Sequence, residues 1–311
     1  KKRDREKGRL GNIIEGLTRE AKEATVRFDA VGSSLKAAKG RWFAGAVDPN
    51  GIDEALLTHC VLPRVTISQI DAIYAARFVE TLVKIGTPGF SAFRYFNTLL
   101  AGVRPLVYTA TEYEAGRMGR FLAETFAVIA GWVDDRKGFE STSKLPGFAK
   151  SMADPEAEGA TYVEFAAAVT KWYNGAAKAF LDIFEAGEYM EMRNALIVLT
   201  KLQGVFPKYM TLYEHLERAV EKIKTSDPRE DLKVLANRYH AVLQREQRDG
   251  SLLPFPDSKE ALEPADSDED MAEADEGEVP QAKATKGGAK AERKPSKPSG
   301  GGKQDRQGGK Q

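Results

Sequence analysis

Cysteine and histidine are scarce in this sequence, which has 311 residues but only one cysteine, Cys60, and three histidines. A single cysteine excludes an internal disulfide framework and fits a reducing compartment. It also excludes a cysteine-rich zinc site. His59, His215 and His240 lie far apart, without the short spacings of histidine metal ligands. We therefore predict no metal site and no cofactor.

Long apolar runs are also missing, and none approaches the ~20 residues of a membrane-spanning helix. We expect no membrane association. No stretch alternates apolar and polar residues convincingly enough to predict a strand. The first nine residues are charged except for Gly8, and no apolar signal-peptide core follows them. Because the sequence does not begin with methionine, we expect it to be part of a longer protein.

Catalytic motifs are absent as well. There is no phosphate-binding GxxxxGK[ST] motif, and residues 86–89 (Gly-Thr-Pro-Gly) place a proline where a phosphate loop needs amide donors. These residues are better interpreted as a helix stop and turn. Cys60 has no histidine or asparagine partner suggested by spacing, so we interpret it as a small core residue. A helical hydrolase would need two converging titratable groups, which the pattern does not show. We predict that the protein is not an enzyme.

Residues 161–205 carry the clearest helical signal. Thr161 and Glu164 form a capping box, and Gly187 suits the left-handed conformation that ends a helix. The second half is apolar on two sides, so more than its hairpin partner must cover it. We predict an antiparallel helix pair within a stack of such pairs. The apolar stripe of its first helix consists of Tyr162, Phe165, Val169, Trp172, Tyr173, Ala176, Phe180 and Ile183.

Further helices are predicted on both sides of this pair. Residues 10–39 indicate a long exposed helix, residues 52–61 a short one that ends before Pro63, and residues 134–155 an irregular segment. Ser68 should cap a helix whose inner face is Ile70, Ile73, Tyr74, Phe78, Leu82, Val83 and Ile85. Short helices are expected at 91–101 and 103–108. Capping boxes at Thr111 and Thr211 predict helices to Val133 and Lys224, and residues 226–228 open a last helix to about Gln247.

The principal helices start near residues 68, 111, 161 and 211, at spacings typical of HEAT and armadillo repeats. We therefore predict an all-α fold: a HEAT/armadillo-like helical-pair solenoid followed by a disordered C-terminal tail. Residues 1–40 would form a charged helix that leads into the body, residues 41–250 the helical-repeat domain, and residues 251–311 the tail.

The tail has opposite charges in its two parts. Residues 257–280 contain eleven acids and one lysine, whereas residues 281–311 contain nine bases and two acids. Flexible cations without apolar neighbours replace counterions on phosphates, which predicts non-specific binding of RNA or single-stranded DNA. Two alternatives stay open: a tail that only keeps the chain soluble, and a nuclear-import signal around residues 293–297. The predicted nucleic-acid-binding residues are Lys283, Lys286, Lys290, Arg293, Lys294, Lys297, Lys303, Arg306 and Lys310.

The acidic part of the tail suggests regulation. It could fold back on the basic part and compete with nucleic acid, which is a hypothesis of autoinhibition. Ser267, followed by Asp268, Glu269 and Asp270, is similar to an acidophilic-kinase site, and a phosphate there would deepen the negative charge.

The pattern around several polar or aromatic residues of the body is compatible with either a structural or a binding role. Arg193 and Asn194 interrupt an apolar helix and are interpreted as a buried polar pair bonded to neighbouring helices rather than as a partner contact. Arg117 and Arg120, or Lys171 and Lys178, could form a basic strip, although such charges more often make a solvated face. Trp132, Trp172 and Tyr173 lie on apolar stripes and are interpreted as core.

A set of short motifs, in order over residues 10–245, resembles the C-terminal domain of the THO complex subunit 2 family. They are HCVLPR at 59–64 with DAIY at 71–74, GTPGFS at 86–91, TE at 111–112, GRFL at 119–122, PGF at 146–148, KW at 171–172, RN at 193–194 with LIVLTK at 196–201, and LER at 216–218. Tyr173 and Val133 depart from the family, which tends to have histidine after each tryptophan. This departure favours a packing role for Trp172 and Trp132.

The resemblance implies a nuclear scaffold subunit of the THO/TREX assembly, which couples transcription to messenger-RNA packaging and export. The implied partners are other THO subunits, the DEAD-box RNA helicase and export adaptors of TREX, and RNA or DNA. The alternative from another class is a helical protein-interaction module of a different assembly, without nucleic-acid contact.

Overall fold

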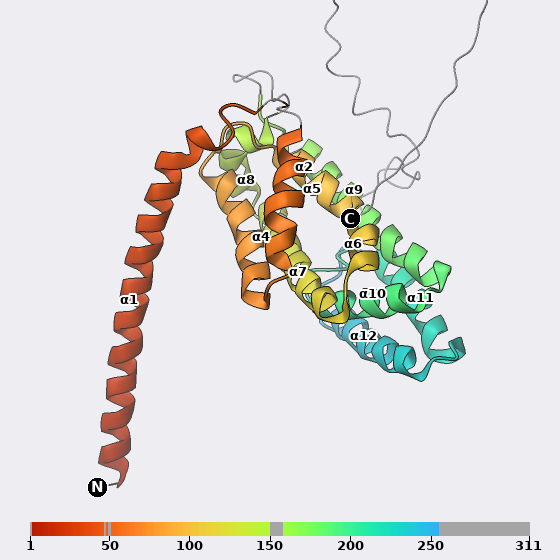
Figure 1. Ribbon diagram of the computed structural model, residues 1–311. Helices are drawn as coiled ribbons and strands as arrows, with labels where there is room; N and C mark the ends of the chain where they lie inside the picture. Colours follow the sequence, from red (N-terminus) through yellow and green to blue (C-terminus); the bar gives the residue numbers. More distant parts are fainter. Residues whose placement is uncertain (1, 47, 49–50, 150–157, 255–311) are drawn as a thin grey trace, which may run out of the picture. The chain divides into compact units, whose positions relative to one another are not determined.

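The computed structural model describes residues 2–46, 48, 51–149 and 158–254 (Figure 1). In this part of the chain every named element is a helix, and β-pairing is limited to the isolated bridges Ala149–Gly159 and Tyr209–Leu253. The all-α prediction is confirmed. The predicted disordered tail lies outside the described residues from position 255 onward, and its disorder stays a prediction.

The chain begins with α1 (Lys2–Trp42), which confirms the predicted long exposed helix. None of its residues is buried. Its C-terminal turns contact the following helices. The Lys39 ammonium donates to the Ile85 carbonyl, and the Trp42 and Phe78 ring centroids are 6.4 Å apart.

The next segment differs from its prediction at Pro63. α2 (Ile52–Leu56) continues through a π-helical turn, η2 (Leu57–Val61), into α3 (Leu62–Val65), which contains the proline near its start. Proline interrupts the regular i→i−4 hydrogen bonding of a helix, and Pro63 lies just after the π-helical turn, where that pattern is already interrupted. The prediction that Cys60 is a core residue is wrong. The buried residues of the π-helical turn are Leu57 and Val61, and Cys60 is exposed.

Helix α4 (Gln69–Lys84) starts as predicted, because the Ser68 hydroxyl accepts from the Asp71 amide at 3.1 Å. Its predicted inner face is partly wrong, since Ile70 and Tyr74 are exposed. Small side chains let the helix come close to α7, with which it packs extensively, so the large residues at its start point elsewhere. Its buried residues are Ala72, Ala75, Ala76, Val79, Leu82 and Val83. Gly86 (φ 65°) then ends the helix, as predicted.

The helices α5 (Ala92–Ala101), α6 (Val103–Thr109) and α7 (Glu112–Asp134) follow. The predicted capping box is confirmed, because the Glu114 carboxylate accepts from the Thr111 amide at 2.8 Å. The prediction of an irregular segment after α7 is wrong for its first part, which forms α8 (Arg136–Thr142) and the 3₁₀ turn η3 (Pro146–Phe148). Asp135 caps α8 by accepting from the Gly138 amide at 2.9 Å.

The central pair consists of α9 (Tyr162–Ala186) and α10 (Tyr189–Lys201). Its capping box at Thr161 and its end at Gly187 (φ 77°) are confirmed. Trp132, Trp172 and Tyr173 are buried, as predicted. However, α10 packs more extensively on α7 and α12 than on α9. A regular stack of consecutive HEAT- or armadillo-like pairs therefore stays a prediction.

The last helices are α11 (Met210–Ser226) and α12 (Glu230–Arg248). The predicted capping box at Thr211 is wrong, because the N-cap of α11 is Tyr209, two residues earlier, and Thr211 lies inside the helix. The Met210 amide donates to the Leu253 carbonyl at 2.9 Å, which holds Tyr209 extended before the helix. α12 also begins later than predicted. Asp227 accepts from the Arg229 amide at 2.9 Å, and the first helical residue is Glu230.

An aromatic cluster lies in the core where α5, α7, α8 and α9 meet. Its rings pack mostly edge-to-face or tilted, with centroids 4.4–6.3 Å apart, as the aromatic quadrupole favours. The cluster consists of Phe93, Phe96, Trp132, Phe139, Phe148, Phe165 and Trp172. None of the helices in the described residues combines the length and apolar character needed to cross a membrane.

Candidate interaction surfaces

The residues predicted to bind nucleic acid all lie outside the described part of the chain. They are Lys283, Lys286, Lys290, Arg293, Lys294, Lys297, Lys303, Arg306 and Lys310, and the same holds for the candidate phosphosite Ser267. Their roles stay predictions.

The candidate basic strip on α7 is engaged in local contacts. Arg117 donates to the Thr66 carbonyl, and Arg120 pairs with Glu124 at 2.8 Å. Glu124 also pairs with Arg77 of α4 at 2.9 Å, so this network links the two helices. These contacts support the solvated-face reading of the arginines rather than a free phosphate-binding strip. Lys171 and Lys178 are exposed on α9.

Asn194 is fully buried in α10, and its side chain forms hydrogen bonds with the connection between α6 and α7. Its Nδ2 atom donates to the carbonyls of Val107 and Ala110, at 3.2 and 2.6 Å. These carbonyls belong to the end of a helix, where intrahelical donors are missing. Arg193 pairs with Glu112 at 2.8 Å, and this hydrogen bond raises the pKa of Arg193. The interpretation as a buried polar residue bonded to neighbouring helices is confirmed for Asn194, whereas Arg193 is half-buried and pairs with an exposed glutamate.

A buried acid that the sequence did not reveal lies in α2. Asp53 is only 2% exposed, and its carboxylate accepts from the Ser91 amide at 2.9 Å, just before α5. Burial raises the pKa of Asp53 to about 6, although the hydrogen bond from Ser91 and the nearby Arg94 charge oppose the shift. Its contacts make it a link between α2 and α5.

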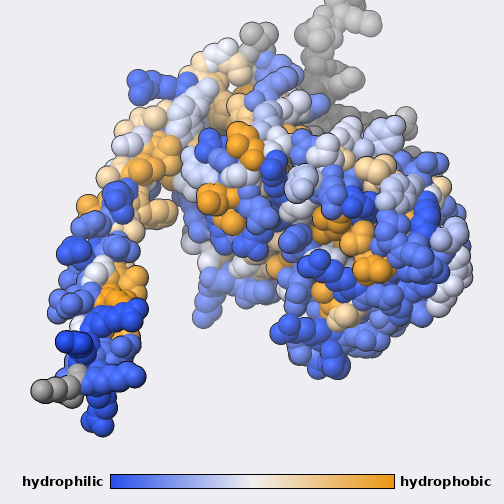
Figure 2. Space-filling model, turned by 60° about the horizontal axis from the view of Figure 1, so that its bottom comes forward, coloured by the Kyte–Doolittle hydropathy of each residue, from blue (hydrophilic) through white to orange (hydrophobic). Residues whose placement is uncertain are grey.

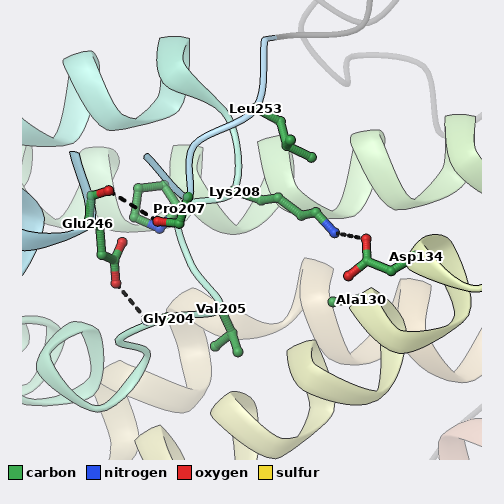
Figure 3. Close-up of a pocket in the computed structure, with 9 residues that line it drawn as sticks. Ala130, Asp134, Gly204, Val205, Pro207, Lys208, Glu246 and Leu253 are labelled. Carbon is green, nitrogen blue, oxygen red and sulfur yellow. Dashed lines mark hydrogen bonds and ion pairs between the residues drawn. The ribbon is translucent and has the colours of Figure 1, made fainter. Parts of the chain in front are cut away.

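A cavity of ≈ 210 Å³ lies between the end of α7, the α10–α11 loop and the end of α12 (Figure 3). This volume is below that of typical small-molecule sites. Glu246 accepts from the Gly204 amide at 2.6 Å, and Lys208 pairs with Asp134 at 3.0 Å, so the polar groups of the wall hold the loop in place.

Burial raises the pKa of Glu246 to about 7, while the hydrogen bond from Gly204 opposes the shift and Asp249 adds to it. Among the described residues, no other titratable side chain forms a hydrogen bond or an ion pair with the Glu246 carboxylate across the cavity. Within those residues, moreover, no group of three His, Cys, Asp or Glu side chains is arranged to hold a metal ion. The polar residues around this cavity connect the α10–α11 loop to α7 and α12, which is a structural role.

Exposed apolar side chains lie at the start of α4 and at the start of α7, and we call them together the α4–α7 patch. Ile67, Ile70 and Tyr74 follow one another at steps of three and four residues and are each more than half exposed. Tyr113 is 78% exposed and lies one turn before Arg117, which contacts Thr66. The Arg64 guanidinium stacks over the Tyr74 ring at 4.5 Å. Exposed apolar groups of this kind mark protein-binding surfaces.

A second exposed apolar surface runs along α1, where Figure 2 shows apolar side chains in a row among charged ones. Its members include Ile14, Leu17, Phe28 and Val31, each more than half exposed. Both surfaces are candidates for the docking of other macromolecules.

Comparisons with known proteins identify relatives that match most of the chain. Residues 1–243 match the family model described as transcription factor/nuclear export subunit protein 2. The chain is 36% identical over 244 residues to THO complex subunit 2 of Arabidopsis thaliana, covering 78% of this chain and 13% of that protein. It is 33% identical over 252 residues to the Homo sapiens protein of the same name, covering 78% of this chain and 16% of that protein.

A more distant relative is THO complex subunit 2 of Saccharomyces cerevisiae, which is 22% identical over 186 residues. That match covers 57% of this chain and 10% of the yeast protein. The chain thus spans less than a fifth of the length of these curated relatives.

Proposed function

Because the chain belongs to the THO complex subunit 2 family, we propose that it is a non-catalytic scaffold segment of a THO-type complex in the nucleus. In this role it would help to couple transcription to messenger-RNA packaging and export. The observation that carries the proposal is the family match over residues 1–243, which covers almost the whole described body. No catalytic function is proposed, because the buried acids Asp53 and Glu246 accept hydrogen bonds from backbone amides of other segments, and no described group of residues is arranged to hold a metal ion.

The proposed partners of the body are other THO subunits, together with the DEAD-box RNA helicase and export adaptors of TREX. The α4–α7 patch is the best supported docking surface, because Ile70 and Tyr113 are 80% and 78% exposed. Large exposed apolar side chains gain most from being covered by a partner.

Substitution of Ile70 by glutamate tests this docking. We expect it to weaken co-purification of the chain with the other THO subunits while the thermal stability of the body stays unchanged. Val234→Glu is the matched control, since Val234 is 67% exposed on α12, outside the patch. Equal recovery of the two variants would argue against the patch.

The proposed role of residues 281–311 is non-specific binding of RNA or single-stranded DNA. Nine bases against two acids support it. If about five of these bases engage single-stranded RNA, log K should fall with log salt at a slope near −3.5, from ~0.7 per phosphate. The tail has no aromatic side chain to stack on bases, so little sequence preference is expected.

Fluorescence anisotropy with a single-stranded RNA tests the tail. A chain ending at residue 280 should lose most of the affinity and of the salt dependence. A full chain in which five bases at the start of α1 are replaced by glutamine is the control: Lys2, Arg3, Arg5, Lys7 and Arg9. If the truncated chain binds as tightly as the full chain, the tail does not bind RNA, and a purely protein-binding module becomes the better proposal.

Removal of residues 257–280 tests the proposed autoinhibition. This tract carries eleven acids, and its loss should raise RNA affinity at low salt by removing competition for the basic tail. Unchanged affinity at low salt would show that the acidic tract does not compete.

A further inference from the structure

The apolar residues of α1 repeat with the period of a coiled coil. Ten consecutive positions alternate at steps of four and three residues: Leu10, Ile14, Leu17, Ala21, Ala24, Phe28, Val31, Leu35, Ala38 and Trp42. Each step of four followed by a step of three adds seven residues, so the pattern repeats every two apolar positions with a period of 3.5 residues, rather than the 3.6 of a straight helix. A strict repeat of this kind over several heptads keeps one seam facing a second helix in a left-handed supercoil. In heptad terms, Ile14, Ala21 and Phe28 occupy a positions, and Leu17, Ala24 and Val31 occupy d positions.

No such second helix is present in the described part of the chain. α1 contains no buried residue, whereas each of the other α-helices described contributes residues to the core. The seam is exposed along residues 10–31, where Phe28 is 77% exposed. Farther along, Leu35 is half-buried, and Trp42 packs near Phe78. Residues 10–31 therefore form the free part of the seam, which we call the α1 seam.

The α1 seam is complementary to a second copy of itself in antiparallel orientation. In an antiparallel pair, a positions face d positions, and a two-fold axis between residues 22 and 23 defines the layers. Ile14 then meets Val31 of the second copy, Leu17 meets Phe28, and Ala21 meets Ala24. Large side chains thus face large ones, and the small ones meet at the centre, where the two backbones can come close.

The charges that flank the α1 seam also fit this arrangement. Glu20 and Arg27 occupy g positions, and both are exposed. In the same antiparallel register, Glu20 of each copy faces Arg27 of the other. The dimer would therefore contain two identical ion pairs between a glutamate and an arginine. In a parallel pair, g positions face e positions. Glu20 would face Thr25 and Arg27 would face Gly32, so neither charge would have a partner.

We propose that the α1 seam forms an antiparallel two-stranded coiled coil with the α1 seam of a second copy of this chain. The partner surface is thus a helix of identical sequence, held by six apolar layers and two reciprocal Glu20–Arg27 ion pairs. This self-association does not depend on the proposed role in messenger-RNA export, because its test measures only the mass of the purified chain.

Sedimentation equilibrium of the full 311-residue chain over a range of concentrations gives the first test. We expect the mass to rise with concentration from 34.2 kDa towards twice that value. Phe28→Asp should keep the chain monomeric over the same range. Val26→Asp is the matched control, because Val26 is 68% exposed on α1 but occupies an f position, farthest from the seam. Neither change removes a buried side chain, so the melting temperature of the body should stay the same.

Charge reversal tests the orientation. Glu20→Arg alone and Arg27→Glu alone should each replace two attractions by two repulsions and weaken dimerisation by about tenfold. The double variant Glu20→Arg/Arg27→Glu should restore the wild-type dimer, because it exchanges the two charges across the same contacts. Since Glu20 and Arg27 do not face each other in a parallel pair, this rescue is specific to the antiparallel one.

Cysteine cross-linking tests the register in a Cys60→Ser background. A mixture of Ile14→Cys and Val31→Cys chains should form an intermolecular disulfide, whereas Ile14→Cys alone should not. In the antiparallel pair, the two copies of position 14 are separated along the axis by about 26 Å, from 1.5 Å per residue.

Three results would overturn the proposal. A chain that stays at 34.2 kDa at every concentration does not self-associate. A dimer that is equally sensitive to Val26→Asp and Phe28→Asp does not use the α1 seam. A monomeric chain in which Phe28→Asp instead weakens assembly with other THO subunits would assign the seam to a helix of a different polypeptide.

Discussion

Gly119 permits the close approach of α7 to α10, and its replacement by alanine is the most direct test of how the body is packed. A Cβ atom at this position would lie 2.9 Å from Lys201 Cβ and 3.1 Å from Val198 Cα. Both atoms belong to α10 close to its backbone, so the contact cannot be relieved by moving the end of a flexible side chain. Gly116, one turn earlier in the same helix, has no atom within 4 Å of the equivalent Cβ position.

The two glycines separate helix propensity from packing. Alanine is favoured over glycine inside a helix by about 1 kcal/mol, so Gly116→Ala should stabilise the body by up to that amount. At Gly119 the same gain is opposed by overpacking of about 1–3 kcal/mol, so Gly119→Ala should be neutral to destabilising. The two variants should therefore differ by about 2 kcal/mol, or about 5 °C in melting temperature for a body of this size.

Urea unfolding followed by circular dichroism measures this difference, and wild type serves as the reference for both variants. The reasoning is refuted if Gly119→Ala is as stable as Gly116→Ala. In that case α7 and α10 would be farther apart than the structure shows, or free to separate without loss of packing.

Two further predictions concern buried polar groups. Asn194→Ala should destabilise the body by about 2–4 kcal/mol in urea unfolding, because it removes the donor from the buried carbonyl of Val107 and from the half-buried carbonyl of Ala110. Arg193→Ala should cost less than about 1 kcal/mol, because it removes only a partly exposed ion pair, and equal losses would contradict this assignment. Burial raises the pKa of Asp53 from 3.8 to about 6, so between these values the native state keeps a proton that the unfolded state has lost, and stability falls as pH rises. Asp53→Asn should therefore gain about 3 kcal/mol relative to wild type between pH ~4 and pH ~7, and a pH-independent difference would show that Asp53 does not titrate in this way.

Structural features that depend only on residues close together in the sequence could be predicted from it. The capping boxes at Thr111 and Thr161 each need only a glutamate three residues later, and both are present. Thr211 has the same spacing but lies inside α11. Its helix start is set by pairing with Leu253, more than forty residues away, and local patterns carry no information on such a contact.

The inner face of α4 could not be predicted for a different reason. Periodicity assigns large apolar residues to the core, but Ile70 and Tyr74 form part of an exposed surface. Alanines at 72, 75 and 76 make the actual contact and give only a weak hydrophobic signal. The sequence thus identified the helix correctly, while its orientation was decided by how closely α7 could approach.

The candidate sites divide in a similar way. The sequence indicated that Asn194 is a buried polar residue, but its acceptors lie more than eighty residues earlier in the chain. The acceptor role of Asp53 towards Ser91 has no sequence signature, because the two elements meet only in the folded body. The seam of α1, in contrast, is a property of one helix and is readable from residue spacing alone.

The central position of α10 has a consequence for how the body comes apart. This helix packs against α6 and α7 from earlier in the chain and against α12 from the end. The body therefore lacks a boundary at which it could be divided near α10 without exposing apolar surface on both pieces. Loss of α10 should unfold its neighbours together, so the body should melt as one cooperative unit rather than helix pair by helix pair.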